Sequence, residues 1–233
     1  MNWLQRKLTG MAASGQLDDA REASRREDYP AAIEIASKAQ KTFQDISDDR
    51  GVMRALCIIG AAQLSMNALE KAETDFTRAQ SLCDSLSKES PNSCDFEQIG
   101  IAMGLGDVMR LSGKEDEAEK LYRQSLAQME KLGYDDTQLP ESAQATNGIA
   151  TILVQRQMYD EAEKYFARAF TAIEFPPNGY HNLYTLSCLV TSNYADLLRK
   201  VNKIDEAEDI EQHAEDLKNA NPKNPNMWSS GAS

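Results

Sequence analysis

The chain has 233 residues, of which 41% are hydrophobic, and its 25 Lys and Arg residues against 37 Asp and Glu residues give a net charge of −12. This hydrophobic content excludes a disordered protein. The negative charge repels the phosphate backbone of nucleic acid, so we expect no nucleic-acid partner. A protein or peptide partner, and a basic one in particular, suits the charge better.

The cysteines and histidines offer little material for a metal or cofactor site. The only two histidines, His181 and His213, lie far apart in the sequence, and no Gly-rich phosphate loop or nucleophile elbow occurs. No Cys-x-x-Cys spacing occurs either, and three of the four cysteines lie in apolar helical patterns, so we interpret them as reduced core residues. We therefore expect no metal, no cofactor and no enzyme activity. The cysteines are Cys57, Cys83, Cys94 and Cys188.

No apolar run reaches the length of about 18 residues that a membrane-spanning helix needs. No long apolar segment follows the two basic residues near the start, so the pattern of a signal peptide is missing. From these two observations we expect a soluble, cytoplasmic protein.

The first predicted element is a short helix in residues 1–15. Trp3, Leu4, Leu8 and Met11 follow one another at helical spacing. We interpret this segment as a cap that covers the first repeat, and the alternative is a weak anchor to a membrane surface or a partner.

The rest of the chain is a repeat array. An Asp-Glu-Ala-Glu motif occurs in residues 116–119, 160–163 and 205–208, and aligning its alanine along the chain gives five copies of a unit with spacings of 40, 46, 44 and 45 residues. Several helical-repeat families have periods in this range, so the period alone leaves the family open. The aligned alanines are Ala32, Ala72, Ala118, Ala162 and Ala207.

Each unit also alternates small and large residues around its aligned alanine. A small residue precedes the alanine by twelve positions, where two helices can approach closely. An aromatic residue follows it by four positions in the three central units, and small residues follow again three positions later, which predicts an interlocking helix surface. The preceding small residues are Ala20, Gly60, Gly106, Ala150 and Ala195, and the positions four after the alanine hold Ala36, Phe76, Tyr122, Phe166 and Glu211.

This pattern resembles the tetratricopeptide repeat family, in the extended-period variant found in kinesin light chains and in many bacterial repeat proteins. The resemblance covers about residues 16–220 and implies an all-α fold, a right-handed α-solenoid of about five helix pairs. It is carried in the third unit by Leu105, Gly106, Gly113, Ala118, Tyr122 and Ser125, and in the fourth by Ile149, Ala150, Tyr159, Ala162, Phe166 and Ala169.

The turns and breaks of the array set the expected helix boundaries. The turn inside each pair holds Asn67, Gly113 or Asn202, residue types that tolerate a left-handed backbone, and Gln157 is the exception. Polar breaks that contain proline separate most pairs. We expect one repeat domain, 16–220, with helix pairs at about 16–44, 50–87, 96–132, 142–174 and 182–218. Residues 221–233 form a predicted disordered tail, in which Trp228 is an incidental aromatic residue or a docking residue for a partner.

The acidic residues of the repeated motif indicate a solvated face rather than a catalytic one, because they recur with the repeat beside the buried alanine. The terminal units depart from the pattern at Ala36 and Glu211, as expected where a helix has one face without a neighbour.

A resemblance to this family implies a ligand-binding groove lined by the first helix of each pair. Asn147 and Asn193 suit an extended peptide, because an amide offers both a donor and an acceptor to a peptide unit, although two ordinary polar residues on an exposed face are the alternative. Asp107 and Arg110 lie three residues apart, and so do Asp196 and Arg199. This spacing predicts either a row of charged side chains that orients a ligand or a local surface ion pair. The predicted groove residues are Leu64, Met103, Asp107, Arg110, Asn147, Thr151, Asn193, Asp196 and Arg199.

These features predict a protein interaction scaffold or adaptor that holds a peptide or helix of a partner. The alternative is a regulatory sensor whose solenoid changes curvature when a peptide or small ligand binds, although no output module is visible. An enzyme with a helical-repeat body would need a polar cluster that the composition does not offer.

Overall fold

The structure, a computed structural model, describes residues 2–135, 139–174 and 184–220, and these residues form ten helices and no strand. The predicted all-α class is therefore confirmed. The predicted tail 221–233 with Trp228 and the segment 175–183 with His181 lie outside the described residues. The helices are α1 (Trp3–Arg25), α2 (Tyr29–Asp45), α3 (Asp49–Ser65), α4 (Leu69–Glu89), α5 (Asp95–Leu111), α6 (Glu115–Lys131), α7 (Pro140–Gln155), α8 (Tyr159–Glu174), α9 (Tyr184–Lys200) and α10 (Ile204–Ala220).

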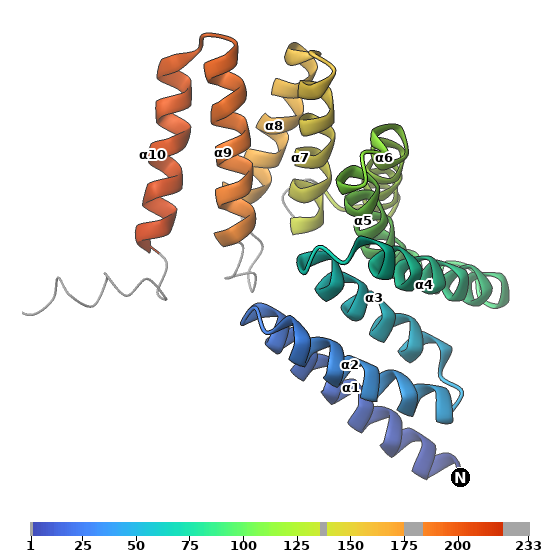
Figure 1. The fold of residues 1–233 in the computed structure, drawn as a ribbon. Helices are drawn as coiled ribbons and strands as arrows, with labels where there is room; N and C mark the ends of the chain where they lie inside the picture. Colours follow the sequence, from blue (N-terminus) through green and yellow to red (C-terminus); the bar gives the residue numbers. More distant parts are fainter. Residues whose placement is uncertain (1, 136–138, 175–183, 221–233) are drawn as a thin grey trace, which may run out of the picture. The chain divides into compact units, whose positions relative to one another are not determined.

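Consecutive helices pack side by side in five pairs, each joined by a short turn (Figure 1). The helix ends lie within a few residues of the predicted pair boundaries, except at the start, where α1 begins at Trp3 and absorbs the segment expected to form a separate cap. The contacts group the chain into two compact units, unit 1 (residues 1–132) and unit 2 (residues 133–233). Within unit 1, α2 packs on α3 and α4 packs on α5, and within unit 2, α8 packs on α9.

The predicted repeat register is visible in the burial of its small residues. All five aligned alanines are fully buried, and the small residue twelve positions earlier is buried in every unit. Phe76, Tyr122 and Phe166 are at most 3% exposed, so the aromatic position also faces the core. The pattern inferred from the sequence therefore describes the helix interfaces correctly.

Phe76 shows how one helix pair packs against the next. A Cβ atom on Gly60, in the same pair, would lie 3.0 Å from the Phe76 ring, and a Cβ atom on Gly104, in the following pair, would lie 2.3 Å from it. The second distance is a steric overlap. The ring thus fills a space that two glycines leave open, one on each side.

The turn inside each pair uses the same backbone device. In the second pair, Asn67 has φ +57°, and the N–H of Ala68 donates to the carbonyl of Gln63. Gln157 has φ +61°, so the residue type that departs from the pattern nevertheless adopts the left-handed conformation. The other three turns place Glu27, Gly113 and Asn202 at φ +62°, +75° and +64°.

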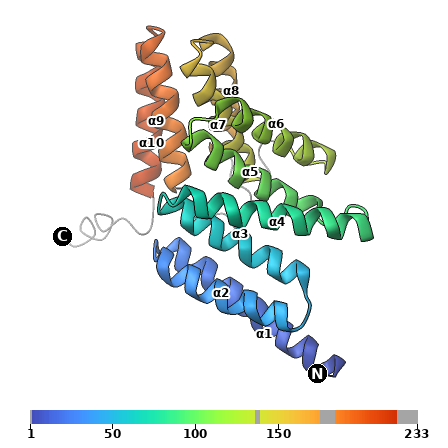
Figure 2. The ribbon, with the colours of Figure 1, turned by 45° about the vertical axis from the view of Figure 1, so that its right-hand side comes forward.

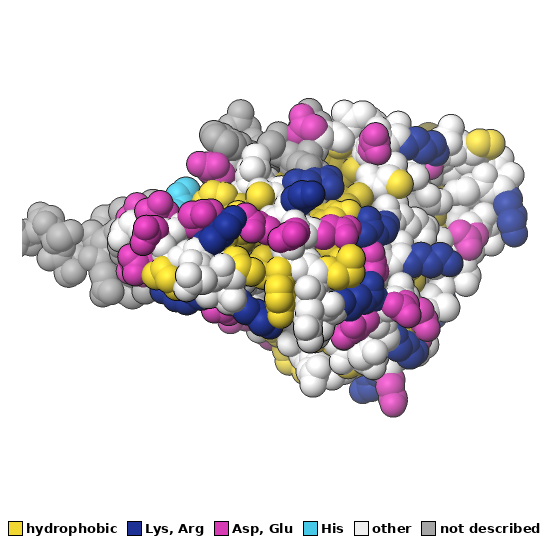
Figure 3. Space-filling model, turned by 90° about the horizontal axis from the view of Figure 1, so that it is seen from above, with side chains coloured by type: hydrophobic (Ala, Val, Ile, Leu, Met, Phe, Trp, Pro, Cys, Tyr) yellow, Lys and Arg dark blue, Asp and Glu magenta, His cyan; other side chains and the backbone are white. Residues whose placement is uncertain are grey.

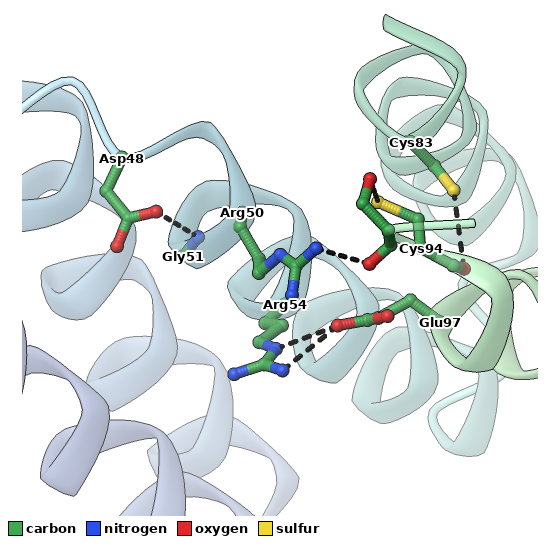
Figure 4. Close-up of polar contacts among 8 residues, drawn as sticks. Asp48, Arg50, Gly51, Arg54, Cys83, Cys94 and Glu97 are labelled. Carbon is green, nitrogen blue, oxygen red and sulfur yellow. Dashed lines mark hydrogen bonds and ion pairs between the residues drawn. The ribbon is translucent and has the colours of Figure 1, made fainter. Parts of the chain in front are cut away.

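Polar contacts fasten α3 to the helix pair that follows it (Figure 4). The Arg54 guanidinium bonds to Glu97 at the start of α5, with Nη2 3.0 Å from Oε1, and Arg50 donates to the carbonyl of Ser93. Asp48 caps α3 by accepting from the N–H of Gly51 at 2.9 Å. The bonds of Arg50 and Arg54 hold the joint between the second and third pairs of unit 1.

The four cysteines are free, as the sequence indicated. Cys83 and Cys94 are buried beside the joint of α4 and α5, and burial raises the pKa of the Cys57 and Cys83 thiols to about 12. Thiols with so high a pKa remain protonated and unreactive at neutral pH.

Candidate binding surface

Unit 2 brings together the two asparagines that the sequence singled out. Nδ2 of Asn193 on α9 donates to Oδ1 of Asn147 on α7 at 3.0 Å. Asn147 is only 6% exposed and Asn193 is half-buried, so they are not two separate exposed residues. Their side chains form a hydrogen-bonded amide pair that links α7 and α9. In this bond Asn193 acts as the donor, and its amide oxygen retains the capacity to accept a hydrogen bond.

A pocket of about 230 Å³ lies beside this amide pair. Phe166 and Leu197, each 1% exposed, contribute apolar surface to it. The hydroxyl of Thr151 donates to the carbonyl of Asn147 at 2.8 Å, which fixes the Thr151 side chain against α7. The pocket is lined by Thr151, Val154, Phe166, Asn193, Asp196, Leu197 and Lys200.

Charged residues surround this apolar pocket. Asp196 is exposed at its lining, and the Lys200 ammonium lies 5.1 Å from the centre of the Tyr159 ring. One interpretation of the Asp-x-x-Arg spacing is a local ion pair between Asp196 and Arg199. The Arg199 guanidinium instead donates to Glu211 on α10, with Nη2 2.9 Å from Oε2. That hydrogen bond lowers the pKa of the Glu211 carboxyl. Glu211, at the position of the aromatic residue in the three central repeats, therefore forms an ion pair inside the last helix pair.

In unit 1 the corresponding arginine serves the core. The Tyr122 hydroxyl donates to Oδ1 of Asp107 at 2.6 Å, and Nε of Arg110 donates to the Tyr122 oxygen at 3.2 Å. Burial, together with the charge of Asp107, raises the pKa of Tyr122, so its hydroxyl remains a donor. Asp107 is 9% exposed. Asp107 and Arg110 thus hold a buried tyrosine, a role that the sequence signalled only by a Tyr hydroxyl at the position where the second and fourth repeats have Phe.

The remaining predicted groove residues offer less surface. Leu64 is half-buried on α3, and Met103 is 3% exposed in the interior of unit 1, where it has no surface for a ligand. Of the nine predicted residues, the pocket therefore assembles Thr151, Asn193 and Asp196. Sequence reasoning did not select Lys200, whose only signal was its position one residue beyond Arg199 at the end of α9.

The electrostatic surface is mixed. On the face shown in Figure 3, Asp and Glu side chains are interspersed with Lys and Arg side chains around exposed hydrophobic groups. Within the described part of the chain, no group of three or more His, Cys, Asp or Glu side chains is placed to hold a metal ion. None of the helices that the structure describes has the length and hydrophobicity needed to cross a membrane.

The described residues form five helix pairs, three in unit 1 and two in unit 2, and so define an all-α helical-repeat fold. Residues 98–174 match the family model described as a tetratricopeptide repeat. The match covers about a third of the chain and falls on the third and fourth repeats, where the motif pattern predicted tetratricopeptide repeats, and the described residues as a whole share the helical-repeat fold. No curated protein sequence matches it.

Solved structures share this fold at low sequence identity. BtubC (BKLC) from P. vanneervenii is 14% identical with a TM-score of 0.63, and the alignment covers 98% of this chain and 93% of that one. A Rap protein complexed with Competence and Sporulation Factor is 16% identical with a TM-score of 0.61, over 90% of this chain and 64% of that one. The Rap conjugation gene regulator of plasmid pLS20, in complex with the Phr* peptide, is 17% identical with a TM-score of 0.59, over 89% and 58%. At these identities the similarity shows the fold.

Proposed function

We propose that this protein is an interaction scaffold that binds an extended peptide segment of a partner protein at the pocket of unit 2. The observation that carries this proposal is the hydrogen-bonded pair of Asn147 and Asn193 beside an apolar pocket. A paired amide held by two neighbouring helices is oriented before a ligand arrives, which reduces the entropy cost of binding.

The chemistry of the pocket suggests how a peptide is held. The Asn193 amide bonds to a peptide unit of the ligand, and one apolar side chain of the ligand enters the pocket against Phe166 and Leu197. A volume of about 230 Å³ has room for one such side chain. Asp196 at the lining and the net charge of −12 favour a peptide with a basic residue next to the apolar one.

Two of the similar structures support a peptide ligand, because one is a Rap protein complexed with Competence and Sporulation Factor and the other is a Rap regulator in complex with the Phr* peptide. This chain spans 64% and 58% of those two chains, so their activity as a whole is not transferred to it. They also favour the second candidate function, a regulator whose shape responds to a bound peptide.

Phage display of random peptides on the immobilised full chain tests the proposal. We expect enriched peptides whose affinity falls roughly tenfold in Asn193→Ala, because one buried hydrogen bond to the ligand is lost. Ser192→Ala is the matched control, since Ser192 is the exposed neighbour of Asn193 and is not part of the pocket. An unchanged affinity in Asn193→Ala, or no enrichment from any library, would refute binding at this site.

Small-angle scattering of the same peptide complex separates the scaffold from the sensor. A scaffold keeps its scattering profile when the peptide binds, whereas a sensor changes it. We propose the cytoplasm as the place of action and binding without catalysis as the activity. A fluorescent fusion that localises to a membrane, or turnover of the bound peptide by the purified protein, would contradict these two proposals.

A further inference from the structure

The N-terminal half of α1 exposes apolar side chains on the side opposite its core. Ala13, Leu17 and Ala20 are buried. Leu4, Leu8 and Met11 are 56%, 57% and 63% exposed and continue at helical spacing into Gly15, Asp18 and Glu22. Trp3, at 73% exposed, and Lys7 lie beside this row near the start of α1, and we call the row together with these two residues the α1 stripe. Figures 1 and 2 both show α1 extending past the end of α2 at its N-terminus.

Comparison with α3 shows what such a stripe is built to contact. Aligning Ala20 with Gly60 places Met11 and Gly15 of the stripe at the positions of Gly51 and Ala55. Both α3 residues are buried, and a Cβ atom on Gly51 would lie 2.2 Å from the Phe43 ring of α2. The α1 stripe thus corresponds to the side of α3 against which α2, the preceding helix, packs.

Two further features of the stripe indicate a helix that approaches closely. A shallow groove of about 690 Å³ runs beside it and is lined in part by Gly10, Ser14 and Gly15. A Cβ atom on Gly15 would meet no atom within 4 Å, so no contact in the described structure requires glycine there. Glycine in the middle of a helix weakens that helix relative to alanine.

The charges on the stripe identify the partner. Lys7 lies in its N-terminal half and Asp18 in its C-terminal half, and both line the groove. When two copies of α1 cross antiparallel near residue 12, Lys7 of each lies opposite Asp18 of the other, and Met11 lies over Ser14 and Gly15. The stripe is therefore complementary to itself, which a two-fold interface requires. An anionic membrane surface would be repelled by Asp18 and by the net charge of −12.

We propose that the protein forms a homodimer in which the α1 stripes of two copies pack antiparallel, with Lys7 of each chain paired to Asp18 of the other. The interface covers the exposed Trp3, Leu4, Leu8 and Met11. All of the residues in this interface belong to unit 1.

Sedimentation velocity of the full chain across a dilution series tests the dimer. We expect a concentration-dependent monomer and dimer equilibrium, and at least about a tenfold weaker association in Met11→Glu, because a charge then enters an apolar contact on both chains. Met66→Glu is the matched control, since Met66 is 50% exposed on a different helix pair. Circular dichroism verifies that both variants fold. A wild-type chain that sediments as a monomer at every concentration overturns the proposal.

A charge exchange tests the antiparallel register. Lys7→Glu and Asp18→Lys are each expected to weaken the dimer, and the double variant is expected to restore it. Within one chain the two residues lie about 16 Å apart along the helix, so rescue can arise only between chains. The bond of Asp18 to Arg21 is lost in both Asp18→Lys and the double variant, so it cannot produce the rescue of one relative to the other. Absence of rescue overturns the register, and a monomer that instead binds phosphatidylserine vesicles assigns the stripe to a membrane and overturns the dimer.

Discussion

Single glycines decide how closely the helices of unit 1 pack. Gly104 and Gly100 lie on the same helix, α5, but in opposite surroundings. A Cβ atom on Gly104 would overlap the Phe76 ring, whereas one on Gly100 would meet nothing within 4 Å. The pair therefore separates the packing role of a glycine from its effect on the helix itself.

We expect Gly104→Ala to lower the free energy of unfolding by about 1 to 3 kcal/mol, because the overlap forces α4 and α5 apart. Gly100→Ala should raise it by up to about 1 kcal/mol through helix propensity alone. Urea unfolding followed by circular dichroism measures both. Equal effects of the two substitutions would show that the assigned contact with Phe76 is incorrect.

The Tyr122 hydroxyl gives a second prediction for a single residue. In Tyr122→Phe, the buried Asp107 loses its bond of 2.6 Å, and Arg110 loses its contact to the same oxygen. We expect the free energy of unfolding to fall by about 1 to 2 kcal/mol. Tyr29→Phe, at the half-buried start of α2, is the control and should stay within about 0.5 kcal/mol of the wild type. A loss of the same size in both variants would contradict the network.

The buried thiols predict a pH dependence. In the unfolded chain the Cys57 and Cys83 thiols ionise near their ordinary pKa of 9.0, whereas in the folded chain burial raises that pKa to about 12. The unfolded state therefore releases protons first, and stability falls as pH rises from 9 toward 12. Urea unfolding across this range should show a steeper decline for the wild type than for Cys57→Ala/Cys83→Ala. Parallel declines would show that the thiols contribute nothing.

Turns are the elements where residue type and backbone disagree most. Gln157 holds φ +61° without the freedom of glycine, while Gly113 occupies the equivalent turn at φ +75°. We expect Gln157→Gly to raise the midpoint of thermal unfolding and Gly113→Ala to lower it, each by an amount that corresponds to about 1 kcal/mol. If Gln157→Gly is instead destabilising, side-chain contacts of Gln157 outweigh its backbone strain.

The helices and their pairing could be predicted from the sequence because the repeat samples the same contact five times. An alanine that recurs with aromatic residues four positions later identifies a buried face even where one unit deviates. The site was less accessible. The sequence singles out Asn147 and Asn193 as two groove residues on different repeats, but their mutual hydrogen bond depends on the spacing of α7 and α9 and is not visible in the sequence. Met103 looked like a groove residue because its repeat position matched, but local packing buries it.

At the level of the whole molecule, the contacts divide the chain between the third and fourth pairs. Unit 1 contains three pairs and a continuous core from α1 to α5, whereas unit 2 contains two pairs. Repeat arrays need about three repeats for stability. We therefore expect residues 1–132 to fold cooperatively when expressed alone and residues 133–233 to be the less stable fragment. Circular dichroism and urea unfolding measure this, and an unfolded 1–132 fragment would contradict it.

The position of the Phe76 ring between Gly60 and Gly104 has a consequence for the recombination of repeats. A complete repeat cut at its loops carries the ring away from one of its two glycines, so the transplanted pair meets a neighbour that lacks the matching gap. Exchange of repeats between proteins should succeed when the crossover falls inside the first helix of a pair, after Gly104 in this case. The segment that can be inherited as a piece is then shifted by about half a helix from the helix pair that the loops outline.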